Sequence, residues 1–397
     1  MKIRPFGVLV HRYSGLAMTV FLVIVGLTGS FLAFYKELDS TINPQLYVEA
    51  NGRSPLEPLV LIEHAALHAA PKADVQSLWM SPEAAQISVS PRLNAQTGKL
   101  FELDFDQLIV DPYTGEELGR RQWGSITEGM INLMPFIYKL HFNLALGEWG
   151  KWILGITALI WTVDCFVGFY LTLPAKLFVA QNNTSTSASF CQRWRRSWTI
   201  KWRGSSFRIN YDLHRAGGLW VWLALLVFAW SSVYMNLSDT VYQKVMQSVS
   251  DYHQPWTDIG DLPEPLTHPT IDLRQAYLLS HQAMSRAATE HGFEIEAPVA
   301  IWFNSAKGFY VYCVRSSTDI QDHAGQTRVV IDASTGEQKM LLLASGQYNG
   351  NTVTSWLMAL HMANIFGLPY RIFVCALGLI IVMLSVTGVV IWLKKRR

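Results

Sequence analysis

Four long apolar windows dominate the sequence and limit what the chain can fold into. They cover residues 13–35, 152–173, 216–237 and 372–393. An apolar helix of about 20 residues is long enough to cross the hydrocarbon core of a bilayer. Only 16% of the 397 residues are charged, whereas soluble proteins average about 25%. We therefore predict an α-helical membrane protein with four transmembrane helices and the lipid bilayer as a partner.

Basic residues cluster at one end of these helices. Lys2, Arg4 and Arg12 precede the first window, and KKRR at residues 394–397 follows the fourth. Six more lie between the second and third windows: Arg193, Arg195, Arg196, Lys201, Arg203 and Arg208. Because short loops rich in Lys and Arg stay cytoplasmic, both termini and the middle loop are expected in the cytoplasm. A net charge of only +2 argues against a nucleic-acid partner.

This orientation divides the chain into seven parts. We expect an N-terminus and first helix at 1–35, an exterior domain at 36–148, a second helix at 149–173, a basic loop at 174–213, a third helix at 214–237, a second exterior domain at 238–370, and a fourth helix with a basic tail at 371–397. If the cell is Gram-negative, the helices lie in its inner membrane and both exterior domains lie in the periplasm.

The two halves of the sequence resemble each other. KLHFNLALGEWGKWILG, from Lys139, matches ALHMANIFGLPYRIFVC, from Ala359, at a constant offset of 220 residues. The match aligns His141 with His361 and Lys151 with Arg371. The phrase LVHRYSGL near the N-terminus returns as DLHRAGGL, which repeats His11-Arg12 as His214-Arg215. The four helices are therefore expected as two tandem repeats.

Each exterior segment carries a similar pattern. LIVDPYTGEELG in the first and VVIDASTGEQKM in the second read as strand, Thr-Gly turn and strand. A helical stretch and alternating strand patterns precede each hairpin. Each segment is therefore predicted to form a small α+β domain, with one helix on an antiparallel sheet.

These motifs resemble the PepSY-associated transmembrane-helix family over nearly the whole chain. The resemblance rests on the HR-x-x-G-L phrases, on Thr28-Gly29 and Thr387-Gly388 inside the membrane, on the D-x-x-TGE hairpins, and on L-H-x-x-L-x-x-G before the second helix. It implies PepSY-like exterior domains. Some members look like inner-membrane di-haem reductases of ferric siderophores, so the resemblance also implies that activity.

Four histidines occupy the repeated positions. His11 and His214 lie near the cytoplasmic ends of the first and third helices, whereas His141 and His361 lie just before the second and fourth, on the exterior side. Two neutral imidazoles on neighbouring helices can ligate a haem iron from both sides. The pattern predicts two b-type haems, one near each membrane surface. A His-Arg pair that only anchors a helix end at the interface is the simpler alternative.

Two further features favour haem over a bare metal ion. Gly15 and Gly218 each follow a histidine by four residues, so they share its helix face and let a flat macrocycle approach the backbone. Cations that can pair with haem propionates repeat beside the histidines: Arg12, Arg215, Lys151 and Arg371. Two imidazoles without a matching cysteine or carboxylate would leave a zinc site half filled.

Asp164 lies within the second apolar window, where an ionisable side chain is costly. Its counterpart at the repeat offset is Leu384, so it is not part of the repeat. Two roles stay open for it: a hydrogen-bonded residue inside the bundle, or a role in proton or quinol chemistry.

Two haems on opposite membrane surfaces indicate a transmembrane reductase. The sequence has no G-x-G-x-x-G fingerprint after a strand, so a separate reductase or quinol is expected to donate the electrons. The family resemblance implies a ferric siderophore as the exterior acceptor. Two alternatives remain: a non-enzymatic, membrane-anchored binding or sensory protein, and a siderophore permease, which the scarcity of polar residues in the helices disfavours.

Overall fold

The structure is a computed structural model that describes residues 3–174 and 189–396. Lys2, Arg397 and residues 175–188 of the predicted basic loop lie outside the described residues. The chain forms two compact units. We call Met1–Ala33, Lys139–Tyr242 and Leu368–Arg397 the helical unit, and Phe34–Tyr138 with Gln243–Gly367 the sheet unit.

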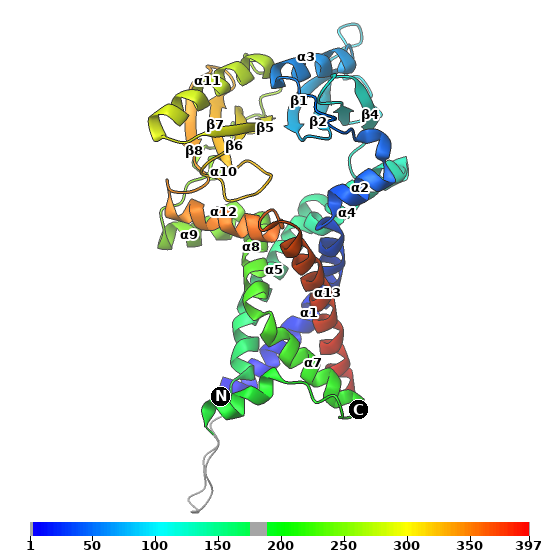
Figure 1. Ribbon diagram of the computed structural model, residues 1–397, viewed down its shortest axis with the longest axis vertical. Helices are drawn as coiled ribbons and strands as arrows, with labels where there is room; N and C mark the ends of the chain where they lie inside the picture. The colour runs from blue at the N-terminus through cyan, green and yellow to red at the C-terminus, as the bar shows by residue number, and fades with distance from the viewer. Residues whose placement is uncertain (1–2, 175–188, 397) are drawn as a thin grey trace, which may run out of the picture. The chain divides into compact units, whose positions relative to one another are not determined.

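Helices build the helical unit, and most of them are long and apolar (Figure 1). They are α1 (Ile3–Leu32), α5 (Gly147–Thr172), α7 (Ser206–Trp220), α8 (Trp222–Asn236) and α13 (Gly367–Arg396). Within the described residues, α1, α5 and α13 are each long and apolar enough to cross a membrane, and α7 with α8 adds a fourth span if the bent pair is counted as one. The protein is therefore a membrane protein, and its described residues provide three or four helices that can span the bilayer.

Shorter elements complete this unit and lead into it. They are α4 (Leu133–Asn143), α6 (Phe190–Arg195), the 3₁₀ turn η4 (Arg196–Trp198) and the π-helical turn η5 (Ser238–Tyr242). α5 packs against both α1 and α8.

The predicted third helix, residues 214–237, is broken at Val221. Val221 leaves the helical region with φ −110° and ψ 13°, and the axes of α7 and α8 differ by 69° there. Gly217 and Gly218 just before the break are poor helix formers, and the indole of Trp222 just after it donates to the carbonyl of Cys165 on α5. His214 therefore lies on α7, separate from the main apolar helix.

The repeated histidines on the exterior side also precede a break. α4 ends two residues after His141, and Leu144 and Ala145 then adopt positive φ angles of 56° and 54°. α12 (Asn349–His361) ends at His361 in the same way, before a turn with positive φ angles. Neither histidine is on the long apolar helix that follows it.

Glycines allow α1 and α13 to approach closely. A Cβ atom at Gly26 would lie 2.8 Å from the carbonyl oxygen of Gly378, and one at Gly378 would lie 2.4 Å from the carbonyl oxygen of Gly26. Ser30 Oγ donates to the carbonyl of Cys375 at the same crossing. This is the small-residue packing that membrane helices use in place of hydrophobic burial.

One eight-stranded antiparallel sheet forms the centre of the sheet unit, in the order β4-β3-β2-β1-β5-β6-β7-β8. The strands are β1 (Ala73–Met80), β2 (Ala85–Pro91), β3 (Gln107–Val110), β4 (Glu117–Arg121), β5 (Ile295–Asn304), β6 (Phe309–Ser316), β7 (Thr327–Asp332) and β8 (Gln338–Leu342). The sequence predicts an α+β domain in each exterior segment. In the structure, the four strands of each segment join through the antiparallel pair β1–β5 into a shared sheet.

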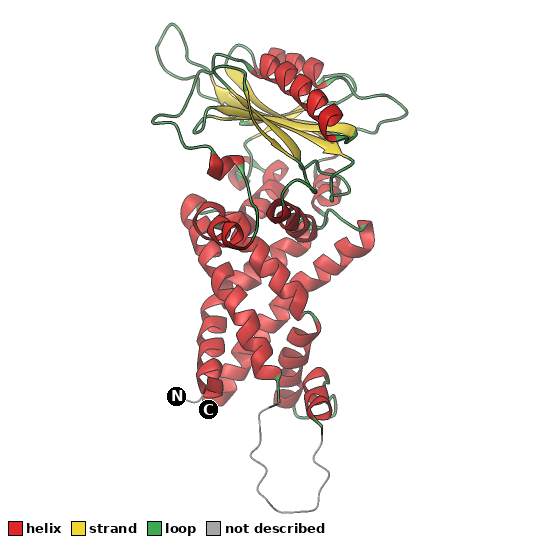
Figure 2. Cartoon of the chain, turned by 90° about the vertical axis from the view of Figure 1, so that its left-hand side faces the viewer, coloured by secondary structure: helices red, strands yellow, loops and turns green. Residues whose placement is uncertain are grey.

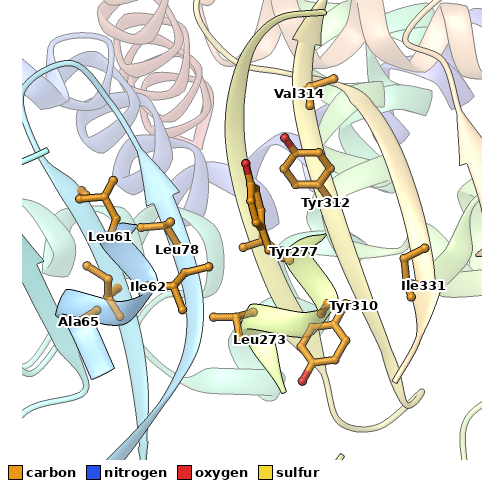
Figure 3. Close-up of a cluster of buried hydrophobic side chains, with 14 of the residues drawn as sticks. Leu61, Ile62, Ala65, Leu78, Leu273, Tyr277, Tyr310, Tyr312, Val314 and Ile331 are labelled. Carbon is orange, nitrogen blue, oxygen red and sulfur yellow. The ribbon is translucent and has the colours of Figure 1, made fainter. Parts of the chain in front are cut away.

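Two helices, α3 (Pro58–Ala69) and α11 (Leu273–His291), cover one face of this sheet (Figure 2). Leu61 and Ile62 from α3 meet Leu78 of β1, while Tyr277 of α11 meets Tyr312 of β6 in the same core (Figure 3). The remaining short elements are α2 (Tyr35–Ile42), η1 (Pro44–Leu46), η2 (Ile126–Glu128), η3 (Met130–Asn132), α9 (Gln243–Val249) and α10 (Pro255–Asp258).

The two predicted Thr-Gly hairpins are confirmed as β3–β4 and β7–β8. In the second, Asp332 Oδ1 accepts hydrogen bonds from the backbone N–H groups of Ser334 and Thr335, at 2.9 Å each. Asp111 makes the same kind of turn in the first hairpin. Gly115 and Gly336 have φ angles of 74° and 78°, which is why the turn uses glycine.

Candidate functional site

A cavity of about 460 Å³ lies within the helical unit, among α1, α5, α7 and α13. Its lining includes six of the residues that the sequence singles out: His11, Arg12, Gly15, His214, Arg215 and Gly218. The volume falls within the roughly 300–1,000 Å³ of pockets that hold small molecules and cofactors. The two HR-x-x-G-L phrases, about two hundred residues apart, thus meet at one cavity.

The imidazoles of His11 and His214 face this cavity together. Their ring centroids are 6.0 Å apart and their planes are inclined by 59°. A metal ion bound to both rings would lie ~2 Å from each nitrogen, with each ring centre about 1 Å further, so the centroids would be about 6 Å apart. The observed separation therefore suits one iron ligated by both histidines.

A carboxylate fixes the orientation of the His11 ring. The Nδ1 atom of His11 lies 2.9 Å and 3.0 Å from the two carboxylate oxygens of Asp164 on α5. Ser14 Oγ donates a second hydrogen bond to Asp164, at 2.8 Å. An ionised carboxylate can only accept, so in a neutral imidazole beside it Nδ1 carries the proton and Nε2 has the lone pair that a metal needs.

The ring of His214 is held by neutral acceptors on α13. Its Nδ1 atom lies 3.0 Å from the carbonyl oxygen of Leu384 and 3.1 Å from Thr387 Oγ1. The Thr387 hydroxyl donates to the carbonyl of Met383, so it accepts from the imidazole. Here too Nδ1 is the donor. Among the described residues, Nε2 of neither ring makes a hydrogen bond.

A glycine on a neighbouring helix lies behind each ring. A Cβ atom at Gly168 would lie 3.3 Å from Cε1 of His11, and one at Gly388 would lie 3.3 Å from Cε1 of His214. On the side of the cavity, a Cβ at Gly15 would meet no atom of the described residues within 4 Å, whereas one at Gly218 would contact Leu384 at 3.7 Å. The cavity thus has room for a flat group beside Gly15.

Four cationic side chains also line the cavity: Arg4, Arg12, Arg215 and Lys395. Two of them have protein partners. Arg4 donates to the carbonyls of Leu171 and Leu173, and Arg215 donates to Asp212 at 2.8 Å and to the carbonyl of Arg196. Arg12 makes no ion pair within the part of the chain that the structure describes. Arg12 and Lys395 are therefore better suited than Arg215 to bind a carboxylate at this cavity.

His141 of the helical unit repeats the geometry of His214. Its Nδ1 atom lies 2.9 Å from Thr28 Oγ1 on α1, and the carbonyl of Val25, three residues before Thr28, also hydrogen-bonds the ring. A Cβ at Gly29 would lie 3.0 Å from Cε1 of His141. The Thr-Gly pairs of α1 and α13 thus have the same role, because the threonine hydroxyl of each pair contacts Nδ1 of one histidine and the glycine lies behind its ring.

The other predicted residues have separate positions. His361 ends α12 in the sheet unit, so its pairing with His141 stays a prediction. Arg371 Nε donates to the carbonyl of Ala33 at the end of α1, at 2.9 Å. Lys151 lies 3.7 Å from the carboxylate of Glu148, one turn away on α5.

The donor set around the cavity fits haem better than a bare metal ion. Among the described residues, no group of three or more His, Cys, Asp or Glu side chains could hold a metal ion. Two imidazoles with free Nε2 atoms, an adjoining cavity with a largely apolar lining, and cations at its surface match what a b-type haem requires.

Sequence reasoning did not assign the residues that orient the rings. It singled out Asp164 without placing it beside His11. A usable signal was present, since Gly168 aligns with Gly388 and Asp164 aligns with Leu384, whose carbonyl contacts His214. The repeat offset therefore links the residues beside His11 with the residues beside His214.

The chain matches the model of a known protein family. The family model described as "PepSY-associated TM region" matches residues 8–395, nearly the whole chain. No curated protein matches the chain.

Proposed function

Since the chain belongs to the PepSY-associated TM family, we propose that it is a transmembrane electron-transfer protein that holds two b-type haems. It passes electrons from the cytoplasmic side, or from quinol, to a ferric siderophore in the periplasm. The observation that carries this proposal is the pair His11 and His214, with centroids 6.0 Å apart at a common cavity and both Nδ1 atoms already hydrogen-bonded.

In this proposal each residue of the site has a defined task. His11 and His214 would hold the haem iron through Nε2, while Asp164, Leu384 and Thr387 hold the two tautomers. Arg12 and Lys395 pair with propionates, and the glycines allow the macrocycle to approach the helices. When bound, the haems supply one-electron carriers at two depths of the membrane.

His141 belongs to the second haem, with His361 as its proposed partner. The support is that Thr28, Val25 and Gly29 hold His141 as Thr387, Leu384 and Gly388 hold His214. By the positive-inside rule, the His11 site lies toward the cytoplasm and the sheet unit lies in the periplasm of a Gram-negative cell.

The reaction at the acceptor is a one-electron reduction. A haem held by His141 would supply one electron to the Fe(III) of the siderophore complex, which would become Fe(II), with no bond made between protein and substrate. Fe(II) is a poorer match than Fe(III) for hard oxygen ligands, so reduction favours its release.

Anaerobic stopped-flow spectroscopy tests this function. The reduced protein is mixed with a ferric siderophore, and a ferrous chelator reports Fe(II) as the haem absorbance changes. We expect fast reoxidation by the ferric complex, none by the iron-free siderophore, and a much slower reaction in His141→Ala. Equal rates in all three experiments would exclude the reductase function.

One observation favours a binding role without redox chemistry. Trp79 of β1 and Trp302 of β5 stack with ring centroids 5.1 Å apart, and Trp79 is 46% exposed. Because Leu78 points into the core beneath α3, its neighbour Trp79 lies on the opposite face of the sheet. Tight siderophore binding by a protein purified without haem from haem-replete cells would favour this second candidate.

A further inference from the structure

Because of Asp164, the two histidines of the cavity have different kinds of hydrogen-bond acceptor. His11 donates to an ionisable carboxylate on α5, whereas His214 donates to a backbone carbonyl and a hydroxyl on α13. The positions correspond, because Leu384, whose carbonyl contacts His214, stands at the repeat offset of Asp164. The carboxylate is therefore an addition at one ring of an otherwise matched pair.

The surroundings of Asp164 show how directly it acts on His11. Its two oxygens lie 2.9 Å and 3.0 Å from Nδ1, and the residue is only 8% exposed. Apart from His11, its hydrogen-bond partner is the Ser14 hydroxyl, at 2.8 Å, within the part of the chain that the structure describes. A buried carboxylate with so few competing donors strengthens the hydrogen bond to the imidazole.

We propose, on the basis of the haem ligation proposed above, that Asp164 is a positioning residue that lowers the reduction potential of the haem at His11 and His214. A carboxylate that accepts from Nδ1 makes Nε2 a stronger electron donor, which stabilises the ferric state relative to the ferrous state. The neutral acceptors at His214 lack this effect.

The consequence is a direction for electron flow. Because Asp164 lowers the potential at the His11 site, whereas the neutral Thr28 hydroxyl and Val25 carbonyl contact His141, the haem at the His11 site is the stronger reductant of the two. Electrons then move downhill from the His11 site toward the His141 site, which the basic residues place on the exterior side.

Redox titration of the purified protein that contains both haems tests this role. Asp164→Asn keeps the shape and an acceptor oxygen but removes the charge. We expect it to raise the reduction potential of one haem only. The reduction equilibrium constant of that haem should increase at least about tenfold, which corresponds to roughly 59 mV for a one-electron couple. Electron paramagnetic resonance of the oxidised protein should show a change in one low-spin signal.

Ser14→Ala is a second variant, and it should shift the reduction potential in the opposite direction. It removes the hydroxyl that also donates to Asp164, so the hydrogen bond between Asp164 and His11 strengthens. The potential of the same haem should therefore fall, by less than it rises in Asp164→Asn. Thr387→Val is the matched control at His214, because it replaces one neutral acceptor and leaves the carboxylate in place; its shift should be smaller than that of Asp164→Asn. A purely structural Asp164 would not give opposite shifts in Asp164→Asn and Ser14→Ala.

The outcomes separate this role from the proposed function. If the wild-type protein binds no haem, the proposed function fails and this role fails with it. If it binds two haems, and both potentials are unchanged in Ser14→Ala and in Asp164→Asn, only the role of Asp164 is overturned. Should Asp164→Asn fail to fold, an unchanged potential in Ser14→Ala is sufficient to reject it.

Discussion

His141 and Thr28 are joined by a hydrogen bond of 2.9 Å between Nδ1 and Oγ1. His214 and Thr387 repeat this contact at 3.1 Å, on a different pair of helices. A histidine used only as an interfacial anchor would need no fixed tautomer, since its polar tip would contact headgroups and water. The repeated contact therefore favours ligand binding over anchoring and leads to the first prediction.

Single histidine substitutions should each remove one haem. In His214→Ala the iron at the cavity loses one axial nitrogen, and in His141→Ala the other haem loses one. We expect haem content to fall from about two to about one per chain in either variant, with different bands lost in the optical spectrum. The pyridine haemochrome assay measures the haem content, and difference spectra show which optical bands are lost. Unchanged content in both variants would show that the axial assignments are wrong.

Filling the cavity at Gly15 should block haem binding without unfolding the protein. A Cβ at this position meets no described atom within 4 Å, so the side chain of Gly15→Leu has room to enter the cavity. We expect loss of one haem and an unchanged elution volume in size-exclusion chromatography. Val20→Leu on the same helix is the control, because Val20 is 63% exposed. Full haem content in Gly15→Leu would place the haem elsewhere.

Gly378→Ala should destabilise the helical unit. The added Cβ would lie 2.4 Å from the carbonyl oxygen of Gly26, so α1 and α13 must separate. Overpacking of this kind costs about 1–3 kcal/mol. Gly7→Ala is the matched control, because its nearest neighbour would be a Leu171 side-chain atom at 3.6 Å. Thermal unfolding in detergent should show a lower midpoint for Gly378→Ala only; equal midpoints would contradict the close crossing.

Asp332→Ala should weaken the sheet unit in a pH-dependent way. Burial acts to raise the pKa of Asp332, but the N–H groups of Thr335 and Ser334 and the nearby Lys339 outweigh it and lower the pKa. A lowered pKa in the folded state means that the stabilisation is present above the unfolded pKa of about 4 and is lost as the pH falls through the folded value. At pH 7 the variant should lose about 1–2 kcal/mol.

Unfolding midpoints at pH 7 and at low pH measure this effect. The gap between Asp332→Ala and the wild type should narrow in acid. Glu337→Ala, at an exposed position of the same turn, should leave the midpoint nearly unchanged. A gap that is the same at both pH values would show that the carboxylate charge does not stabilise the turn.

Cysteine labelling tests the orientation that Lys and Arg predict. Gln96→Cys and Glu337→Cys are exposed positions of the sheet unit, and Arg203→Cys is exposed in the basic loop. Cys191 is exposed and should first be replaced by Ser. A membrane-impermeant maleimide should label the first two in intact spheroplasts and the third only after lysis. The opposite pattern would reverse the direction of electron flow.

The sequence predicts those features that depend on local patterns. Apolar windows of bilayer length give the spanning helices, and the Asp-x-x-Thr-Gly-Glu phrases give both hairpins. The repeat identifies His11 and His214 as equivalent, although it does not say that their rings face each other. Alternating exterior patterns likewise predict strands without showing which strands pair.

Other features depend on contacts between distant residues and leave weak local signals. The break at Val221 follows two glycines, yet glycine pairs also occur in unbroken membrane helices. The partner of Asp164 could not be identified because 153 residues separate it from His11. The pairing of β1 with β5 joins strands from opposite halves of the chain, so no periodicity reveals it.

The β1–β5 pair also has a consequence for fragments of this protein. β1 and β5 run antiparallel, as two copies of one strand do when a two-fold axis relates them. A chain cut after its first four strands would present β1 as an open edge with unpaired backbone groups. In the full-length protein the second half of the chain supplies the partner strand for this edge, so the shared sheet resembles one formed by two covalently linked copies.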